Sequence, residues 1–444
     1  MSDATLFGDG GDGERRESGR GPVVAGPPRL LTAERRQVTL QPCDLESLLP
    51  PEHRARAIWA MVERLELTRF YEGIRAREAE PGRPATDPKV LVALWLYATC
   101  DGIGSARELA RRCAEDDAYR WLRGGVPVNH HTLSDFRTGH AAALDELLTQ
   151  VLAALLKAGL LTLKRVAQDG LRVRASAGTG SFRRRPRLAQ CLEAARDHVA
   201  AMKAAGDSAA AAKRTRTQAA QERAVREREA RVTQALAELE KVEALRAQQR
   251  GGHRSRSEPR ASKTDGEART MHMGDGGYRP AYNVQLATET TSGVIVGVQV
   301  TNAGTDGAQA VPMVAEIERR LGARPAEYLV DGGFATAATV EVLSAQGITV
   351  YAPVPERRGI AETHAPRAQD SAAVAEWRQR MASEEAKPIY RERAATAERV
   401  NADLRTWRTL DRFLVRGLRK TLSVVLWNAL AFNLLRWAAL TGPA

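Results

Sequence analysis

The stretch AEYLVDGGFAT, residues 326–336, places an aspartate and two glycines directly after a short apolar run. The apolar run has the length and composition of a buried strand. A strand end does not need a carboxylate, and a buried charge is costly unless another group pairs with it. Glycine lets a backbone or a ligand approach closely. Asp331 is therefore a candidate site residue at the end of a strand.

A second aspartate stands beside a glycine in LTLKRVAQDGLRVRASAG, residues 161–178. The alternating apolar residues indicate a strand, with Asp169 and Gly170 in the turn at its end. From residue 278 the period is again two: residues 281–290 and 293–304 predict a hairpin. The remaining pattern predicts a helix over 308–322, a strand ending at Asp331, a helix over 337–347 and a strand over 348–355. This order predicts an α/β fold, a mixed sheet flanked by helices on both faces.

The rest of the chain divides by composition. Residues 1–45 are rich in glycine, proline and charge, which predicts a disordered leader, and residues 46–160 carry apolar residues at helical spacing, which predicts an all-helical domain. The sheet then belongs to a catalytic domain over 161–440, interrupted by a basic helical or coiled-coil insertion over 183–262. Near-heptad spacing within the insertion involves Val225, Val232, Ala235, Leu239 and Val242.

The net charge and the spacing of the cysteines limit the classes of function that the chain can have. The net charge is +12 over 444 residues, which indicates a polyanionic partner, with nucleic acid the leading class. The cysteines have no zinc or redox spacing, and no secretory signal opens the chain, so a cytoplasmic protein is expected. The apolar run over 421–440 contains Asn428, Asn433 and Arg436, which favours a buried helix over a membrane span.

If the sheet resembles that of ribonuclease H, Asp169 and Asp331 lie on neighbouring central strands, and two carboxylates so placed point to a cation. They repel each other and raise one pKa unless a cation lies between them. Mg²⁺ is the expected ion, because it prefers oxygen ligands and is usually held by one or two carboxylates. A third carboxylate, Glu398, lies on the helical pattern YRERAATAERVNADLRTWR, residues 390–408, with Glu392 and Asp403 as competitors. Two such ions support in-line phosphodiester chemistry.

Two further aspartates have other expected roles. Asp306 is expected to be a helix cap or an auxiliary site residue, and Asp275 to be a loop residue.

Taken together, these stretches resemble a family, the DDE transposases of bacterial insertion sequences. The matching pieces run from about residue 46 to 437: DPKVLVALWLYATCDGIGSARELARRC, NHHTLSDFR, DGLRVRASA, TDGEARTMHMGDGGYRPAYNVQLATE, YLVDGGFAT and YRERAATAERVNADLRTWRTLDRFLVRGLRK. Each piece alone is weak, whereas their order is specific. The resemblance implies a helical DNA-binding domain followed by a ribonuclease H-like catalytic domain.

The resemblance also implies roles for individual residues. Asp169, Asp331 and Glu398 become the catalytic and metal-binding triad, holding two Mg²⁺ ions for which Mn²⁺ can substitute. Tyr390, Arg393, Glu398 and Arg405 resemble the tyrosine-arginine-glutamate-basic signature, in which the basic residues touch DNA. Two departures stand out: Arg405 replaces the usual lysine, and the interval from Arg393 to Glu398 is one residue longer than the signature.

A further DNA contact is expected at VNHHTLSDFRTGH, residues 128–140. Thr132 and Ser134 are candidate caps, and a helix start that carries His131, Thr132, Ser134 and Arg137 is suited to phosphates or base edges. A capped helix with a solvated basic face is the alternative.

The expected function is that of a transposase which binds the inverted repeats of its element, cleaves the ends and joins them to target DNA. Its expected partners are double-stranded DNA and a second copy of the chain, as a homodimer or larger synaptic complex at the nucleoid, with no membrane. Two alternatives stay open: a nuclease of the same fold without strand transfer, and an inert DNA-binding regulator.

Overall fold

Residues 44–74, 76, 84–208, 216–248, 258–356 and 363–442 are described by the computed structural model. Residues from Asp44 onward belong to one compact unit. The leader expected over 1–45 lies outside the described residues except for Asp44 and Leu45. Two stretches of the expected insertion, 209–215 and 249–257, also lie outside them.

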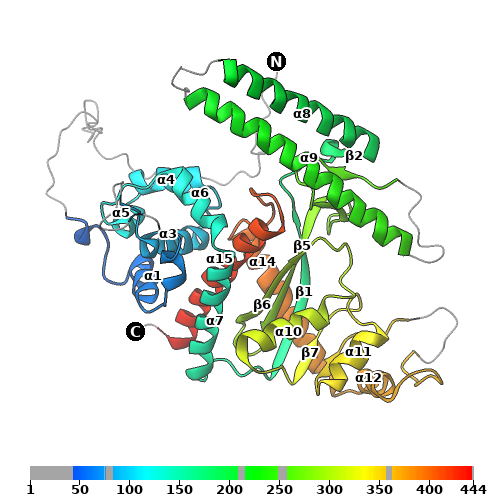
Figure 1. Cartoon of the computed structure of the whole chain (residues 1–444). Helices are drawn as coiled ribbons and strands as arrows, with labels where there is room; N and C mark the ends of the chain where they lie inside the picture. Colours follow the sequence, from blue (N-terminus) through cyan, green and yellow to red (C-terminus); the bar gives the residue numbers. More distant parts are fainter. Residues whose placement is uncertain are drawn as a thin grey trace, which may run out of the picture. The chain divides into compact units, whose positions relative to one another are not determined.

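The chain between residues 46 and 157 is helical (Figure 1). Its elements are the 3₁₀ turn η1 (Glu46–Leu48) and the helices α1 (Arg54–Glu63), α2 (Thr68–Tyr71), α3 (Pro88–Cys100), α4 (Ala106–Glu115), α5 (Asp117–Arg123), α6 (His130–Gly139) and α7 (Ala141–Lys157). Helix α3 starts at a proline, and the preceding Asp87 accepts a hydrogen bond from the Lys89 N–H at 2.8 Å. Most of α3 is buried, so it forms the centre of this helical part.

The cap of α6 differs from the expected one. Asn129, not Thr132 or Ser134, caps the helix, and its Oδ1 accepts from the N–H groups of His131 and Thr132 at 2.9 Å each. The expectation failed because the helix begins at His130, which puts Thr132 and Ser134 inside it. Asparagine is as good a cap as serine, so the turn residue before the helix already carried the signal.

The main sheet is mixed. Its strands are β1 (Arg165–Arg174), β4 (Arg269–His272), β5 (Tyr278–Glu289), β6 (Ile295–Thr301), β7 (Glu327–Leu329) and β8 (Thr349–Tyr351). The hydrogen-bonded order is β4-β5-β1-β7-β8, with β6 paired to the same edge of β5 as β4 but further along it. Strand β5 is antiparallel to β1 and β6, whereas β7 is parallel to β1 and β8. Strands β1 and β7, which correspond to the first and fourth strands of the expected sheet, are therefore neighbours.

Strand β1 does not end at Asp169. It continues in regular pairing with β5 past Asp169, opposite Leu286, to Arg174, opposite Ala281. The turn expected at Asp169 and Gly170 is wrong, because this glycine is inside a strand, where glycine often marks the close approach of another group. Beyond the sheet pairing, Arg174 also bonds through its backbone to Asp411 and Phe413.

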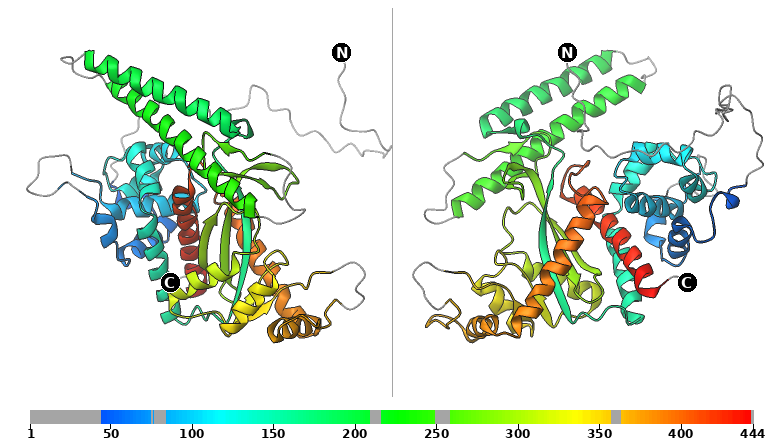
Figure 2. Two further views of the ribbon diagram at one scale, coloured as in Figure 1. Left: turned by 45° about the vertical axis from the view of Figure 1, so that its right-hand side comes forward. Right: turned by 180° about the vertical axis from the view of Figure 1, so that it is seen from behind.

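Helices cover both faces of the sheet. They are α10 (Ala310–Leu321), α11 (Ala337–Ala345), α12 (Ala372–Ala382), α13 (Ala386–Arg393), the π-helical turn η3 (Ala394–Glu398) and α14 (Arg399–Thr406). On one face, Ala167 of β1 clusters with Ala386 and Ala397, and Figure 2 (right) shows the orange helix containing α13 and α14 lying across the sheet. On the other face, the Gln168 amide contacts the carbonyl of Gln309, at the start of α10, at 3.3 Å.

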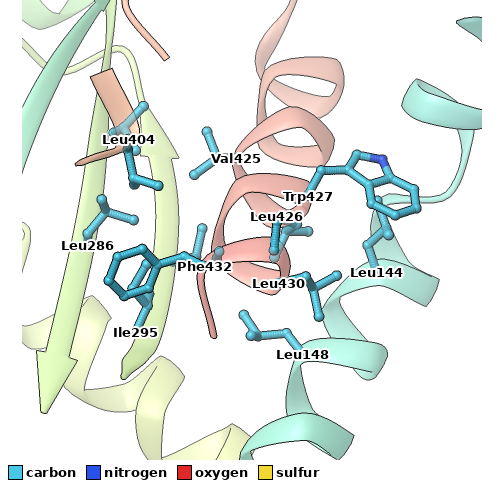
Figure 3. Packing of buried hydrophobic residues seen from close by; sticks show 14 of the residues in the cluster. Leu144, Leu148, Leu286, Ile295, Leu404, Val425, Leu426, Trp427, Leu430 and Phe432 are labelled. Atoms are coloured by element: carbon cyan, nitrogen blue, oxygen red, sulfur yellow. The ribbon is translucent and has the colours of Figure 1, made fainter. Parts of the chain in front are cut away.

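Helix α15 (Leu418–Thr441) joins the helical part to the sheet. Figure 3 shows Leu426 and Leu430 close to Leu144 and Leu148 of α7, with Phe432 near Ile295 of β6. The Asn433 side chain makes two hydrogen bonds with the backbone of Ile295: its Oδ1 accepts from the N–H at 2.9 Å and its Nδ2 donates to the carbonyl at 2.8 Å. The helix is long and apolar enough to span a membrane, yet 61% of its apolar window is buried inside the protein. The expected buried helix is found over most of residues 421–434, whereas residues 435–440 are half-buried or exposed.

Between β1 and β5 the chain forms the 3₁₀ turn η2 (Thr179–Ser181), the short strands β2 (Phe182–Arg183) and β3 (Ala261–Ser262), and two long helices, α8 (Arg185–Ser208) and α9 (Arg216–Gln248). The two helices pack against each other (Figure 1). Val232, Ala235 and Leu239, three of the near-heptad residues, are buried in a small apolar cluster with Leu188 and Ala261.

Candidate active site

Asp169 and Asp331 meet at the centre of the sheet. Ala167 of β1 pairs in parallel with Leu329, the last residue of β7. Two residues further on lie Asp169, inside β1, and Asp331, just past the end of β7. One guanidinium contacts both carboxylates: Nη2 of Arg393, from α13, lies 3.1 Å from Asp169 Oδ1 and 3.7 Å from Asp331 Oδ2. The parallel pairing thus brings together two acids that are 162 positions apart in the sequence.

The two carboxylates differ in environment. Asp169 is only 18% exposed, and burial raises its pKa, as do the charges of Asp331 and Asp306, while Arg393 opposes the shift. The Asp331 side chain is 41% exposed, and its Oδ1 accepts the Gly333 N–H at 2.8 Å. Asp169 is therefore the enclosed member of the pair, and Asp331 is the one open to solvent.

Asn401 of α14 is a further partner of Asp169. Its Nδ2 donates to Asp169 Oδ2 at 2.9 Å. Its Oδ1 is buried and has no hydrogen-bond partner among the described residues. A buried acceptor without a donor is costly in a native structure, and a nearby cation or water would satisfy it. The amide thus holds one carboxylate oxygen and leaves its own oxygen available beside the site.

Gly170 is required by a carboxylate on the opposite face of β1. A Cβ at residue 170 would lie 2.6 Å from Asp306 Oδ1 and 2.8 Å from Gln285 Nε2. Asp306 accepts from the amides of Asn283 at 2.6 Å and Gln285 at 2.7 Å, and from Arg172 at 3.2 Å. This buried network, which lies directly behind Asp169, explains why a glycine follows that aspartate.

The close approach at Gly170 predicts a large effect of one methyl group. Gly170→Ala is expected to lower stability by about 1–3 kcal/mol, because overpacking must displace the bonded Asp306 carboxylate. The matched control is Gly332→Ala beside the other aspartate, where nothing lies within 4 Å of the added Cβ. Thermal unfolding of the two variants should show a lowered midpoint for Gly170→Ala only. Equal midpoints would show that Asp306 moves aside freely.

Glu398 is the last residue of the π-helical turn η3. Its side chain is exposed, and within the described residues it makes no ion pair or hydrogen bond, so the structure does not bring it to the two aspartates. The two competing carboxylates are engaged elsewhere: Glu392 pairs with Arg165, and Asp403 pairs with Arg408 at 2.8 Å. Glu398 is thus the acid of this helix that has no partner.

The π-helical turn accounts for the extra residue between Arg393 and Glu398. In an α-helix, residues four apart lie on one face, whereas a π turn closes with an i→i+5 hydrogen bond and aligns residues five apart. The turn from Ala394 to Glu398 takes up one residue within an otherwise α-helical segment. Glu398 consequently regains the alignment with Arg393 that a four-residue interval would give in a regular helix.

The remaining residues of the signature lie along the same helix. Tyr390 packs against the small apolar cluster of Ala167 and Leu329, and burial raises its pKa. Arg405 is exposed on α14 and has no ion pair in the part of the chain that the structure describes. Arg393 is the member held at the aspartates, with a side chain only 12% exposed.

The candidate DNA-contacting residues of α6 are divided between surface and core. His131 and Ser134 are exposed and Thr132 is half-buried. Arg137 is buried: it donates to the Gly104 carbonyl and lies over the Trp95 ring, 4.8 Å from its centroid. Leu133, Phe136 and Arg137 share the buried face, and this i, i+3, i+4 spacing could have indicated that Arg137 faces inward.

The donor chemistry at the aspartates suits a divalent ion. Carboxylate oxygens of Asp169 and Asp331, together with the unpartnered amide oxygen of Asn401, are the oxygen ligands that Mg²⁺ prefers. In the described ranges no group of three His, Cys, Asp or Glu residues is close enough to hold a metal ion. Arg393 supplies the positive charge between the two carboxylates instead.

Two family models match the chain. One, a transposase domain (DUF772), matches residues 43–139, which include α1 to α6. The other, a transposase DDE domain, matches residues 242–434, which include Asp331, Arg393 and Glu398, whereas Asp169 precedes the match. No curated protein and no solved structure matches the chain.

Proposed function

Because this chain belongs to the DDE transposases of bacterial insertion sequences, we propose that it binds the terminal inverted repeats of its element, cleaves the DNA there and joins the freed ends to target DNA. The observation that carries this proposal is the meeting of Asp169, in β1, with Asp331, which follows the adjacent parallel strand β7. Two acids that share one guanidinium form a site for positive charge, and phosphodiester chemistry needs such a site.

The strand order supports a ribonuclease H-like catalytic domain. An antiparallel trio, β1, β5 and β6, is extended on the other side of β1 by the parallel strands β7 and β8. The interruption of this order by α8 and α9 supports the insertion over 183–262. The boundary proposed at residue 160 separates the helices that precede the sheet from the catalytic domain, with α15 packed against both.

In the proposed site, Asp169 and Asp331 would hold the metal ions, and the exposed Glu398 would supply the third carboxylate. When bound, two Mg²⁺ ions activate the attacking oxygen and stabilise the leaving oxygen of an in-line displacement. Asp169 is oriented by Asn401 and by the Gly170 N–H, at 2.9 Å each. Glu398 is assigned as the third acid because Glu392 and Asp403 are held in ion pairs away from the aspartates.

The basic residues of the signature position the DNA. Arg405 is exposed without a carboxylate partner among the described residues, so its guanidinium is available to a phosphate. Arg393 contacts both aspartates, and its guanidinium would be available to a phosphate if bound metal ions supplied the positive charge there. Tyr390 packs beside Arg393 and fixes the side of the helix from which that arginine reaches the site.

End recognition is assigned to the helical domain. His131, Thr132 and Ser134 are at the surface or close to it at the start of α6, where a helix can face phosphates and base edges. Arg137 is buried with Leu133 and Phe136, so it does not belong to this exposed face of α6. Two ends must be processed together, so a homodimer or larger complex in the cytoplasm, at the nucleoid, is the proposed working form.

The test is a cleavage and joining assay with a labelled duplex that carries the element's own end. Cleavage followed by joining to a target plasmid is expected with Mg²⁺ or Mn²⁺, and neither step is expected with EDTA. Cleavage without joining would identify a nuclease of the same fold. Tight end binding without cleavage in either metal would identify an inert regulator, and would overturn the proposed function.

A further inference from the structure

A polar cavity of about 520 Å³ lies away from the aspartates, between the helical part and the loop that follows α14. Its walls come from the α3–α4 connection at Gly104 and Ser105, from Arg137 of α6, from Arg408 and Arg412 of the loop, and from Asn428 of α15. No role assigned above uses this cavity.

The lining is predominantly positive. Arg137, Arg174, Arg408 and Arg412 face two carboxylates, those of Glu108 and Asp411. Both acids have cations of their own, because Glu108 pairs with Arg111 and Arg112, and Asp411 pairs with Arg174. Arg408 is paired with Asp403 at 2.8 Å. Within the described residues Arg137 and Arg412 have no carboxylate partner. The cavity therefore has uncompensated positive charge.

Several buried polar atoms in this lining also lack partners. Nε of Arg137, Nη1 of Arg408 and Oδ1 of Asn428 have no hydrogen-bond partner among the described residues, in side chains of residues only 9%, 7% and 2% exposed. The two nitrogens are donors and suit an anionic oxygen, whereas the amide oxygen needs a water beside it. Unsatisfied donors on buried guanidinium groups are costly, so they point to a ligand.

Arg137 makes the strongest case for an anion. Burial lowers its pKa to about 10, so it stays charged at neutral pH while deprived of solvent. The Gly104 carbonyl and the Trp95 ring offset part of this cost, but neither has a full negative charge. An anion in the cavity would offset much more of it.

Two features of the backbone around the cavity are also consistent with an anion site. Thr409 has a positive φ of 53°, which is rare for a β-branched residue and is a feature of functional sites. Helix α4 begins at the cavity, with Ser105 as its N-cap, so the positive end of its dipole faces the same space.

We infer that this cavity binds a backbone phosphate of DNA, held by Arg412 at its exposed rim and by Arg137 and Arg408 at its floor. The identification of the phosphate as that of DNA rests on the proposed function, whereas the anion site does not. The loop that contains Arg408 and Arg412 follows α14, the helix of Arg405, and Arg137 is on α6. A phosphate bound here would connect the end-recognising helix with the catalytic segment.

The test compares Arg412→Gln with Arg64→Gln in the full chain. Both residues are exposed arginines without an ion pair in the described ranges, and only Arg412 lines the cavity. Affinity for the end duplex is measured in EDTA at several NaCl concentrations, so catalytic activity plays no part. Arg412→Gln is expected to weaken binding about 5- to 10-fold and to reduce the slope of log K against log salt by about one, as for one lost phosphate contact. Arg64→Gln should leave both values unchanged.

A second probe, inorganic phosphate, separates the sources of the anion. At constant ionic strength it is expected to raise the unfolding midpoint of the wild type but not that of Arg412→Gln. Stabilisation by phosphate together with unchanged DNA binding in Arg412→Gln would mean a site for a free anion, and would overturn the assignment to DNA. No effect of the substitution on either probe would overturn the anion site itself. A wild type that binds phosphate but not DNA would count against the DNA assignment and the proposed function together.

Discussion

Asp331→Asn is expected to abolish Mg²⁺-dependent cleavage of the element end while leaving end binding intact. The asparagine keeps the size of the side chain and loses the charge that would bind the cation. Metal stabilisation of the reacting oxygens is worth several kcal/mol, and each 1.36 kcal/mol is a factor of ten, so a loss of about 1,000-fold is expected. The measurement is single-turnover cleavage of the labelled duplex, with binding followed separately in EDTA.

The chain offers a closely matched control for this substitution. Asp275 is also followed by two glycines, and its Oδ1 accepts the Gly277 N–H at 3.2 Å, as Asp331 accepts from Gly333. Asp275 pairs with Arg279 at an exposed turn and contacts no other acid in the described residues. Asp275→Asn is expected to cleave at the wild-type rate. Equal cleavage by Asp331→Asn and the wild type would remove Asp331 from the reaction and would leave Asp169 without its partner acid.

The contrast between these two aspartates shows what the sequence could predict. Both stand in the same three-residue pattern, and the preceding apolar run marked Asp331 as the strand end. That β1 and β7 would be neighbours was implied by the resemblance to a ribonuclease H-like sheet, not by strand periodicity. Periodicity could not show that the Asp306 carboxylate is hydrogen-bonded directly behind Gly170. The two residues are far apart in the sequence and become neighbours only in the folded protein. For that reason the sequence alone predicts a turn at Gly170.

The misplacements at α6 have a different physical origin. Residue type alone predicts Thr132 or Ser134 as the cap. The cap is instead the residue with extended backbone geometry just before the first turn, and that residue is Asn129. Arg137 was assigned to DNA by its charge, although its helical position relative to Leu133 places it inward. Asn401 was missed because an amide has no charge, yet it is three residues after Glu398, a spacing that places neighbours on one helical face.

Glu398→Gln is expected to lose about as much activity as Asp331→Asn, about 1,000-fold, because it would remove the third acid of the proposed site. The matched control is Glu392→Gln on the same helical segment, whose side chain is 42% exposed and pairs with Arg165. That variant is expected to cleave within about tenfold of the wild type, because its ion pair is partly solvated and lies outside the site. If Glu392→Gln were inactive and Glu398→Gln active, Glu392 and not Glu398 would be the third acid of the site.

The π-helical turn gives this prediction a second arm. Deleting Thr396 from the turn places the glutamate four positions after Arg393 instead of five. A regular α-helix puts residues four apart on one face, as the π turn does for residues five apart. The shortened chain is therefore expected to keep cleavage within about tenfold, since residues four apart again share a face, and Glu398→Gln in that background should remove it. A shortened chain that binds DNA and unfolds at the wild-type midpoint but does not cleave would contradict this alignment. It would mean that the width of the π turn, and not only the face on which Glu398 lies, is needed for that carboxylate to take part in cleavage.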